Sequence, residues 1–404
     1  MNREEILQEI LNLRGKHFLL EIATGVGKTR LTIEKIRQFY LNNPTFENIL
    51  VVVPRLVHFS VWREEVNKWW PGCPLNITTT AYASLQKHKG NWDFVIFDEC
   101  HHLSERCIEL LPGFEIKHAF LLSATVPWGM KQIFRSNFPG IVFYTKTLSE
   151  AVEDNILPDP IIIELPLQLD NELKSETIVL NKHRKYGNHI TSTFDQRDTA
   201  RNVYRVGKIT IPCTQWEYNE MIEEEITKAR DEYEQTGKQF VKWQWLGLAG
   251  DRLKFLSQVK VPITNAILTR LKDFRTITFC NSIAQTEALG KYCINSKKKE
   301  SKQYLNDFNA GKIKHITACN MLNEGINLNN CRIAIFNNYN SSDLLVTQRV
   351  GRTLRHRQPI IILPYYEGTK EEFLLSKIES NSNCNIYTAE SIDGIIRYIK
   401  EKIK

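Results

Sequence analysis

A glycine-rich segment near the amino terminus, residues 23–29, reads ATGVGKT and separates an apolar run from a stretch with helical spacing. Gly25 and Gly27 permit the backbone dihedrals that bring N–H groups close to phosphate oxygens. Lys28 would reach the β and γ phosphates of a nucleotide, and the Thr29 hydroxyl would bind Mg²⁺. Alternatively, the glycines only form a tight strand-to-helix turn. The predicted cofactor-binding residues are Thr24, Gly25, Val26, Gly27, Lys28 and Thr29.

Two neighbouring carboxylates, Asp98 and Glu99, follow the apolar run 94–97. Ligands collect at the carboxyl ends of buried parallel strands, where this pair is expected to lie. Asp98 is suited to hold Mg²⁺ through water, and Glu99 to orient or deprotonate a water that attacks a γ-phosphate. Alternatively, both are solvated loop residues. The nearby cysteines and histidines (Cys100, His101, His102 and Cys107) match no common zinc spacing.

A third group of polar residues lies near the carboxyl terminus, where residues 348–355 read QRVGRTLR. Gln348, Arg352 and Arg355 share one face at helical spacing. A guanidinium group can bind a γ-phosphate and stabilise charge in the transition state. The alternative is a solvated basic helix surface.

The elements that must position these residues are two sets of apolar runs that alternate with helical stretches. The runs are 17–23, 48–54, 93–99 and 118–125, then 275–280, 314–319, 331–337 and 359–365. Such runs suit strands buried on both faces, so they predict an α/β fold with two parallel sheets. The capping-box pair Thr214 and Glu217, with Gly237 further on, predicts a helical insertion at about 170–262. The segment NILPDP (155–160) interrupts regular secondary structure, so it predicts a boundary between domains 1–155 and 156–404.

Composition narrows the class of protein. The chain has 404 residues, 42% hydrophobic and 25% charged, with a formal net charge of +7, so a polyanionic partner is permitted. Nine cysteines without a C-x-x-C pair argue against a disulfide framework. The charged amino terminus and the lack of long apolar runs predict a cytoplasmic protein that is not associated with a membrane.

Eight motifs occur in a familiar order. They are ATGVGKT (23–29), VVVPR (51–55), TTTAYASL (78–85), DECHH (98–102), SAT (123–125), TFCNS (278–282), LNEGINL (322–328) and QRVGRTLR (348–355). This series resembles the motifs of DEAD/DEAH-type helicases of superfamily 2, most of all the type III restriction motor (ResIII) and phage UvsW-like group. The resemblance covers residues 1 to about 365. It implies two RecA-like domains with ATP and Mg²⁺ between them and nucleic acid across both.

The resemblance also implies residue roles. The catalytic set would be Lys28, Asp98, Glu99, Gln348, Arg352 and Arg355. Thr29 and Asp98 would bind the metal, and Gly325 would be a further cofactor-binding residue. Ser123 and Thr125 would couple hydrolysis to domain movement. The nucleic-acid contacts would be Arg55, Thr79, Asn281, Ser282 and Asn320.

Two basic segments and an aromatic cluster lie outside these motifs. Residues 297–314 hold six lysines and two acids, and residues 182–208 hold seven basic and two acidic residues. They would either follow a phosphate backbone or form solvated faces. Phe240, Trp243 and Trp245 would either stack on bases or pack in the core.

The leading hypothesis is an ATP-dependent DNA helicase or double-stranded DNA translocase in recombination, repair or replication. It would act on duplex or branched DNA, with a protein partner for specificity. The alternatives are an RNA helicase, a motor subunit of a restriction or nuclease complex, and a nucleotide-gated binding module without turnover.

Overall fold

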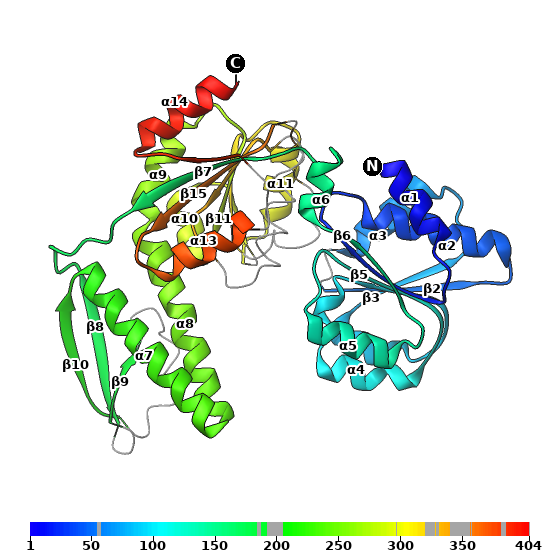
Figure 1. Cartoon of the computed structure of the whole chain (residues 1–404), viewed down its shortest axis with the longest axis horizontal. Helices are drawn as coiled ribbons and strands as arrows, with labels where there is room; N and C mark the ends of the chain where they lie inside the picture. The colour runs from blue at the N-terminus through cyan, green and yellow to red at the C-terminus, as the bar shows by residue number, and fades with distance from the viewer. Residues whose placement is uncertain are drawn as a thin grey trace.

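The computed structural model folds the chain into two lobes, each built around a parallel sheet (Figure 1). It describes all residues except 55–57, 184–186, 192–204, 296, 320–327, 329–330, 340–355, 357, 381–384 and 404. Two parallel-sheet lobes with helices are the fold class that the apolar runs predicted.

The amino-terminal lobe contains a six-stranded sheet in the order β3-β2-β4-β5-β1-β6, with all pairs parallel. Its strands are β1 (His17–Ile22), β2 (Asn48–Val53), β3 (Asn76–Ala81), β4 (Gly90–Asp98), β5 (Phe114–Ser123) and β6 (Val142–Lys146). Its helices are α1 (Arg3–Asn12), α2 (Lys28–Asn42), α3 (His58–Trp69), α4 (Glu105–Leu110), α5 (Trp128–Asn137) and α6 (Leu148–Glu153), with 3-10 turns η1 (Tyr82–His88), η2 (Cys100–His102) and η3 (Leu111–Gly113). Because β4, β5 and β1 are adjacent and parallel, the segments that follow them meet at one edge of the sheet.

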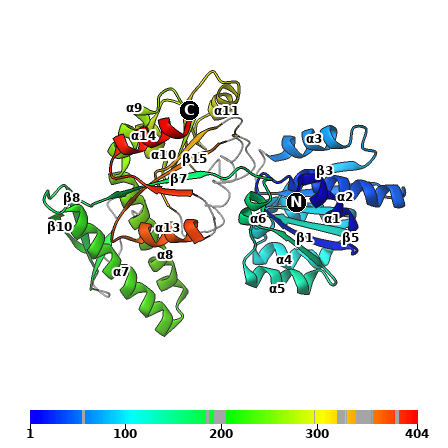
Figure 2. The ribbon, with the colours of Figure 1, turned by 45° about the horizontal axis from the view of Figure 1, so that its top comes forward.

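Helices cover both faces of this sheet: α1, α2 and α3 lie on one side, and α4 and α5 lie on the other (Figure 2). One core contains Ile36 of α2 and Trp62 of α3 with Leu20 of β1. The other contains Phe134 of α5 with Leu121 of β5. Alternate side chains of each strand therefore enter different cores, which explains why the central strands are continuous apolar runs.

Lys35 of α2 fixes the carboxyl end of α1. Its Nζ donates hydrogen bonds to the backbone oxygens of Leu11 (2.6 Å) and Leu13 (2.8 Å). A cation is favoured at this end of a helix because the last carbonyls have no partner within the helix. Burial lowers the pKa of Lys35 to about 8.

The carboxyl-terminal lobe contains a seven-stranded parallel sheet in the order β12-β13-β11-β14-β15-β7-β16. Its strands are β7 (Ile161–Leu167), β11 (Thr276–Cys280), β12 (Cys293–Ile294), β13 (His315–Cys319), β14 (Ile333–Phe336), β15 (Ile360–Tyr366) and β16 (Asn385–Thr388). Its helices are α9 (Val261–Arg270), α10 (Ile283–Leu289), α11 (Ser301–Asn309), α13 (Lys370–Ser380) and α14 (Ile392–Ile403).

The insertion extends away from this sheet (Figures 1 and 2). The expected helices are present as α7 (Gln215–Thr236) and α8 (Gln239–Val259), and Thr214 and Glu217 form the predicted capping box. Gly237 ends α7 at a positive φ of 61°. The structure adds an antiparallel sheet, β10-β8-β9, made of β8 (Glu176–His183), β9 (Gly187–Thr191) and β10 (Arg205–Cys213).

His315 provides a test of the carboxyl-terminal core. Its Nε2 lies 3.3 Å from the Thr278 hydroxyl, and burial lowers the pKa of the imidazole from 6.5 to about 4. Since the folded pKa lies below the unfolded value, the neutral imidazole stabilises the fold above pH 6.5, and this contribution is lost as the pH falls to 4. The shift corresponds to about 3 kcal/mol.

We therefore expect the free energy of unfolding of the wild type to fall between pH 7 and pH 4 by about 3 kcal/mol more than that of His315→Gln. Urea unfolding followed by circular dichroism at several pH values measures the difference. Equal pH dependence in the two proteins would contradict a neutral, buried His315.

Candidate nucleotide site at the carboxyl edge of the amino-terminal sheet

The glycine-rich loop lies between the end of β1 and the start of α2. Gly25 and Gly27 have φ values of 100° and 120°, which favour glycine. A Cβ at Gly27 would meet no atom within 4 Å, so the backbone conformation rather than crowding requires glycine there. The buried Thr24 hydroxyl oxygen has no hydrogen-bond partner in the structure. A helix amino terminus, positive-φ glycines and an unsatisfied hydroxyl fit a phosphate group.

Two basic side chains reach this loop. Lys28, at the first position of α2, donates from Nζ to the backbone oxygen of Ile22 (2.8 Å). The Arg3 guanidinium donates to the backbone oxygens of Gly25 (3.3 Å) and Ile156 (3.4 Å). Arg3 was not predicted because only the fold brings α1 beside the loop. Thr29 follows Lys28 on the first turn of α2 and is half-buried.

The carboxylate pair lies where the sequence predicted it, at the end of β4. Asp98 is the last residue of the strand, and Glu99 is 7% exposed. Glu99 has a left-handed backbone, with φ of 50° and ψ of 57°. For a residue other than glycine this conformation costs about 1–3 kcal/mol and persists where the surroundings enforce it. Glu99 is therefore held in a fixed direction and is not a solvated loop residue.

Ser123 connects the acidic segment to the segment after β5. Its hydroxyl donates to the backbone oxygen of Thr125 (2.7 Å), and Nδ1 of His101 lies 3.0 Å from the same hydroxyl oxygen. Because the serine proton is directed to Thr125, this contact requires the proton on Nδ1 of His101. Nδ1 also lies 3.6 Å from a carboxylate oxygen of Glu99. The His101 imidazole therefore connects Glu99 to Ser123, whose hydroxyl is bonded to Thr125.

Glu21 of β1 forms a second connection at this edge. Its carboxylate accepts hydrogen bonds from the backbone N–H of Val126 (2.7 Å) and from Nζ of Lys131 (2.5 Å). The strand before the phosphate loop is thereby bonded to the segment that follows Thr125.

In the carboxyl-terminal lobe, the predicted residues Asn281 and Ser282 follow β11 directly. The Asn281 N–H donates to Oε1 of Gln285 (2.9 Å), and Nε2 of Gln285 donates to the Ser257 hydroxyl (2.5 Å). The Ser282 hydroxyl caps α10 by accepting the Gln285 N–H (3.2 Å). Both positions are therefore fixed to the end of α8.

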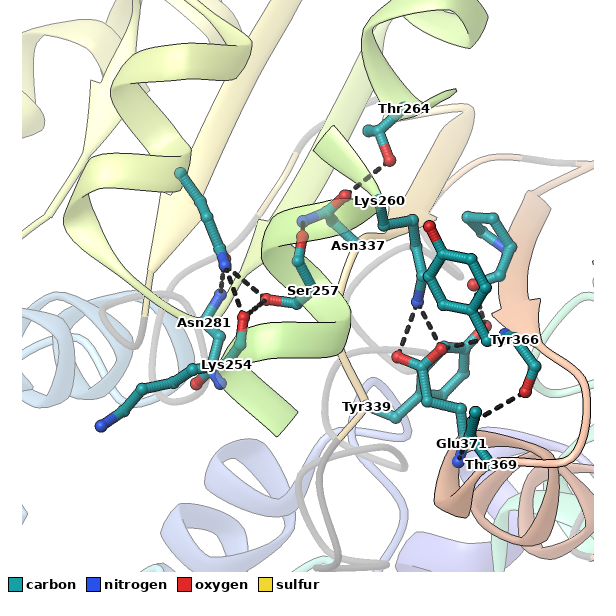
Figure 3. Close-up of polar contacts among 12 residues, drawn as sticks. Lys254, Ser257, Lys260, Thr264, Asn281, Asn337, Tyr339, Tyr366, Thr369 and Glu371 are labelled. Atoms are coloured by element: carbon teal, nitrogen blue, oxygen red, sulfur yellow. Dashed lines mark hydrogen bonds and ion pairs between the residues drawn. The ribbon is translucent and has the colours of Figure 1, made fainter. Parts of the chain in front are cut away.

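The junction of α8 and α9 is bonded to the centre of the same sheet (Figure 3). Asn337, just after β14, donates to the backbone oxygen of Ser257 (2.9 Å) and accepts from the Thr264 hydroxyl (2.6 Å). Lys260 and Glu371, both 0% exposed, form an ion pair at 2.6 Å. Burial lowers the pKa of Lys260 and raises that of Glu371, because desolvation outweighs their mutual attraction.

The other predicted residues fall into two groups. Thr79 lies within β3, at one side of its sheet, and is half-buried. The rest lie outside the described residues: Arg55, Asn320, Gly325, Gln348, Arg352 and Arg355. The geometry described above therefore concerns Lys28, Asp98, Glu99 and their neighbours in the amino-terminal lobe.

The aromatic cluster of the insertion is split between two environments. Phe240 and Trp243 are 64% and 67% exposed, so neither is a core residue. Trp245 is half-buried and stacks on Tyr233 with ring centroids 6.0 Å apart. The lysines that surround α11 (Lys297, Lys299, Lys302, Lys312 and Lys314) are exposed.

Comparison with known proteins identifies the class of enzyme to which the chain belongs. Residues 2–127 match the family model of the type III restriction enzyme res subunit, and residues 259–357 match the helicase conserved C-terminal domain. The DNA 3'-5' translocase XPB2 of Sulfurisphaera tokodaii is 22% identical over 375 residues, which cover 87% of this chain and 77% of that protein.

The fold has counterparts among solved structures. Dbp5 of S. cerevisiae bound to RNA and ADP BeF3 aligns with a TM-score of 0.59 and 12% identity over 100% of this chain and 93% of that chain. This likeness shows the fold, which consists of two RecA-like parallel-sheet domains. The class is therefore an ATP-hydrolysing enzyme of helicase superfamily 2. Within that superfamily, the chain is related to the type III restriction motor.

Among the residues that the structure describes, no helix combines the length and apolar character needed to cross a membrane.

Substitution of Glu99 is the most direct test of this site. Glu99→Gln keeps the size of the side chain but removes the carboxylate that is expected to act as the base. We therefore expect ATP turnover to fall about 10²–10⁴-fold while nucleotide binding is retained. Steady-state phosphate release and titration with a fluorescent ATP analogue measure the two effects. Glu105→Gln, an exposed change on α4, is the control. Retention of wild-type turnover by Glu99→Gln would exclude Glu99 as the base.

Proposed function

We propose that the chain is an ATP-dependent DNA translocase or helicase that acts on duplex or branched DNA. One observation carries this proposal. The phosphate loop, the pair Asp98 and Glu99, and Ser123 meet at one edge of a RecA-like sheet, in a chain that matches both helicase family models. The choice of DNA is supported by the translocase relative.

In this proposal the amino-terminal lobe holds the nucleotide. The loop N–H groups and Lys28 bind the phosphates, and the Thr24 hydroxyl supplies a further contact. Thr29 and Asp98 would hold Mg²⁺, which neutralises charge on the β and γ phosphates when bound. Glu99 orients the attacking water and accepts its proton. The fixed backbone of Glu99 supports this role, because a base must be positioned before the reaction begins.

The carboxyl-terminal lobe would complete the site. We propose that domains 1–155 and 156–404 are divided by the segment between α6 and β7, where Asn155 has a positive φ of 56°. Gln348, Arg352 and Arg355 belong to the segment between β14 and β15, and Gly325 to that between β13 and β14. Gln348, Arg352 and Arg355 would reach the γ-phosphate when the lobes close, so hydrolysis would favour reopening.

The same edges of the two sheets would carry the nucleic acid. Arg55 and Thr79 belong to the amino-terminal lobe, and Asn281, Ser282 and Asn320 to the other. Three of the exposed lysines, Lys297, Lys299 and Lys302, follow β12 directly or lie on the first turn of α11, and Asn281 follows β11 in the same parallel sheet. They would therefore add phosphate contacts beside Asn281. We further propose that a protein partner supplies specificity or, in a restriction complex, the nuclease.

ATP turnover with different nucleic acids tests the proposal. Phosphate release is measured without nucleic acid and with single-stranded DNA, duplex DNA, forked DNA and RNA. We expect duplex or forked DNA to stimulate turnover most, with Lys28→Ala inactive throughout because it lacks the phosphate contact. Stimulation by RNA alone would instead support the RNA helicase, and no stimulation by any of them would refute a nucleic-acid motor.

The salt dependence of DNA binding tests the lysines. Replacing Lys297, Lys299 and Lys302 by alanine should reduce the slope of log K against log salt by about 2–3, since each phosphate contact contributes about 0.9. Fluorescence anisotropy of labelled duplex DNA at several salt concentrations measures this slope. The control replaces three exposed lysines elsewhere in the lobe, namely Lys272, Lys400 and Lys402. An equal slope in both variants would remove these lysines from the DNA path.

A further inference from the structure

Two buried aromatic side chains donate hydrogen bonds to Asp98 from outside the nucleotide-binding motifs. Nε1 of Trp62 lies 2.8 Å from Oδ2 of Asp98. The hydroxyl of Tyr82 lies 2.8 Å from the backbone oxygen of the same residue. Trp62 is 1% exposed and Tyr82 is 7% exposed, so water cannot readily replace either donor. One residue of the site thus receives two donors from distant parts of the chain.

Both donors lie shortly after segments that are proposed to contact nucleic acid. Trp62 lies on α3, which follows β2 and the motif that contains Arg55. Tyr82 directly follows β3, which contains Thr79. The strands β3, β2 and β4 are neighbours in the sheet, so their carboxyl ends lie side by side. Each segment proposed to contact nucleic acid in this lobe is therefore followed by an aromatic donor to Asp98.

Both groups act as donors in the folded protein. An indole nitrogen can only donate, so the Asp98 carboxylate oxygen accepts in this contact. The Tyr82 hydroxyl is also the donor in its contact, because the backbone oxygen of Asp98 can only accept. A hydrogen bond to a carboxylate that binds a metal orients that carboxylate, and its loss typically costs about 10–100-fold in metal affinity or activity.

We propose that Trp62 and Tyr82 are positioning residues that transmit nucleic-acid binding to the Mg²⁺ ligand Asp98. This inference rests on the proposed function. Phosphate contacts at Arg55 and Thr79 would fix α3 and η1, and the two donors would then hold Asp98 in its metal-binding orientation. Trp62 acts on the carboxylate itself, and Tyr82 acts on the backbone that carries it. Trp62 should therefore have the larger effect on metal binding.

The test uses substitutions that keep an aromatic ring and remove the donor. Trp62→Phe should raise the Mg²⁺ concentration needed for half-maximal binding of a fluorescent ATP analogue by about tenfold. Binding of the analogue in excess EDTA should stay at the wild-type level. Tyr82→Phe should raise the Mg²⁺ requirement about threefold, a smaller change because the backbone keeps its other constraints. In both variants the ratio of DNA-stimulated to basal ATP turnover should fall.

Matched controls are available in the same lobe. Trp69, also on α3, donates to the Glu65 carboxylate over the same 2.8 Å, and the Tyr144 hydroxyl donates to Glu9 (2.6 Å). Trp69→Phe and Tyr144→Phe each remove one side-chain hydrogen bond of similar length that does not involve Asp98. They should leave the Mg²⁺ requirement unchanged. Thermal unfolding of all four variants shows whether a change follows from lost stability.

The result that overturns the inference is a Mg²⁺ requirement for Trp62→Phe equal to that for Trp69→Phe. The inference would also be overturned if the Mg²⁺ requirement rose in all four variants in proportion to the fall in Tm. Lost packing alone would then explain the change. The metal titration contains no DNA, so it remains decisive if the wild type responds to no nucleic acid. In that case the proposed function fails while the role of Trp62 toward the metal ligand is tested separately.

Discussion

The candidate site depends on one constraint, the common direction of β4, β5 and β1. These strands are neighbours, and their carboxyl ends deliver Asp98, Ser123 and the phosphate loop to the same edge. Reversal of any one of them would send its segment to the opposite edge. Parallel strands need crossovers and burial on both faces, which the helices provide. The polar site at the sheet edge therefore depends on the two apolar cores that cover the faces of the sheet.

The polar contacts at this edge form a connected set because the strands are close together. Glu21 bonds the segment after Ser123 to β1, and His101 bonds Ser123 to the acidic segment. Glu99 keeps an unfavourable backbone conformation among these contacts. A network of this kind resists rearrangement, since breaking one member leaves a buried polar group without its partner. The end of β1, from which the glycine-rich loop begins, is therefore held in a fixed position relative to the Ser123 segment.

The sequence predicted the central strands because both of their faces are apolar. It missed β3, whose sequence NITTTA is polar at one side of the sheet, and the two-residue β12. It also missed β6, β7 and β16, which belong to the two parallel sheets. The positions of Thr24, Lys28, Asp98 and Glu99 could be predicted because these residues lie at or just after the ends of strands in the sequence. Trp62 and Arg3 could not, since their contacts with Asp98 and Gly25 span 36 and 22 residues and leave no periodic signal.

Buried polar contacts also hold the insertion of the carboxyl-terminal lobe in place. At the end of α8, Lys260 pairs with Glu371, and Glu371 also accepts the backbone N–H of Tyr366 (3.1 Å). Rotation of α8 about this point would separate two buried charges, which costs about 3–5 kcal/mol when one partner is lost. The helix is thus held as a rigid extension of the sheet. The exposed Phe240 and Trp243 near its far end consequently have a fixed position relative to Asn281 and Asn337.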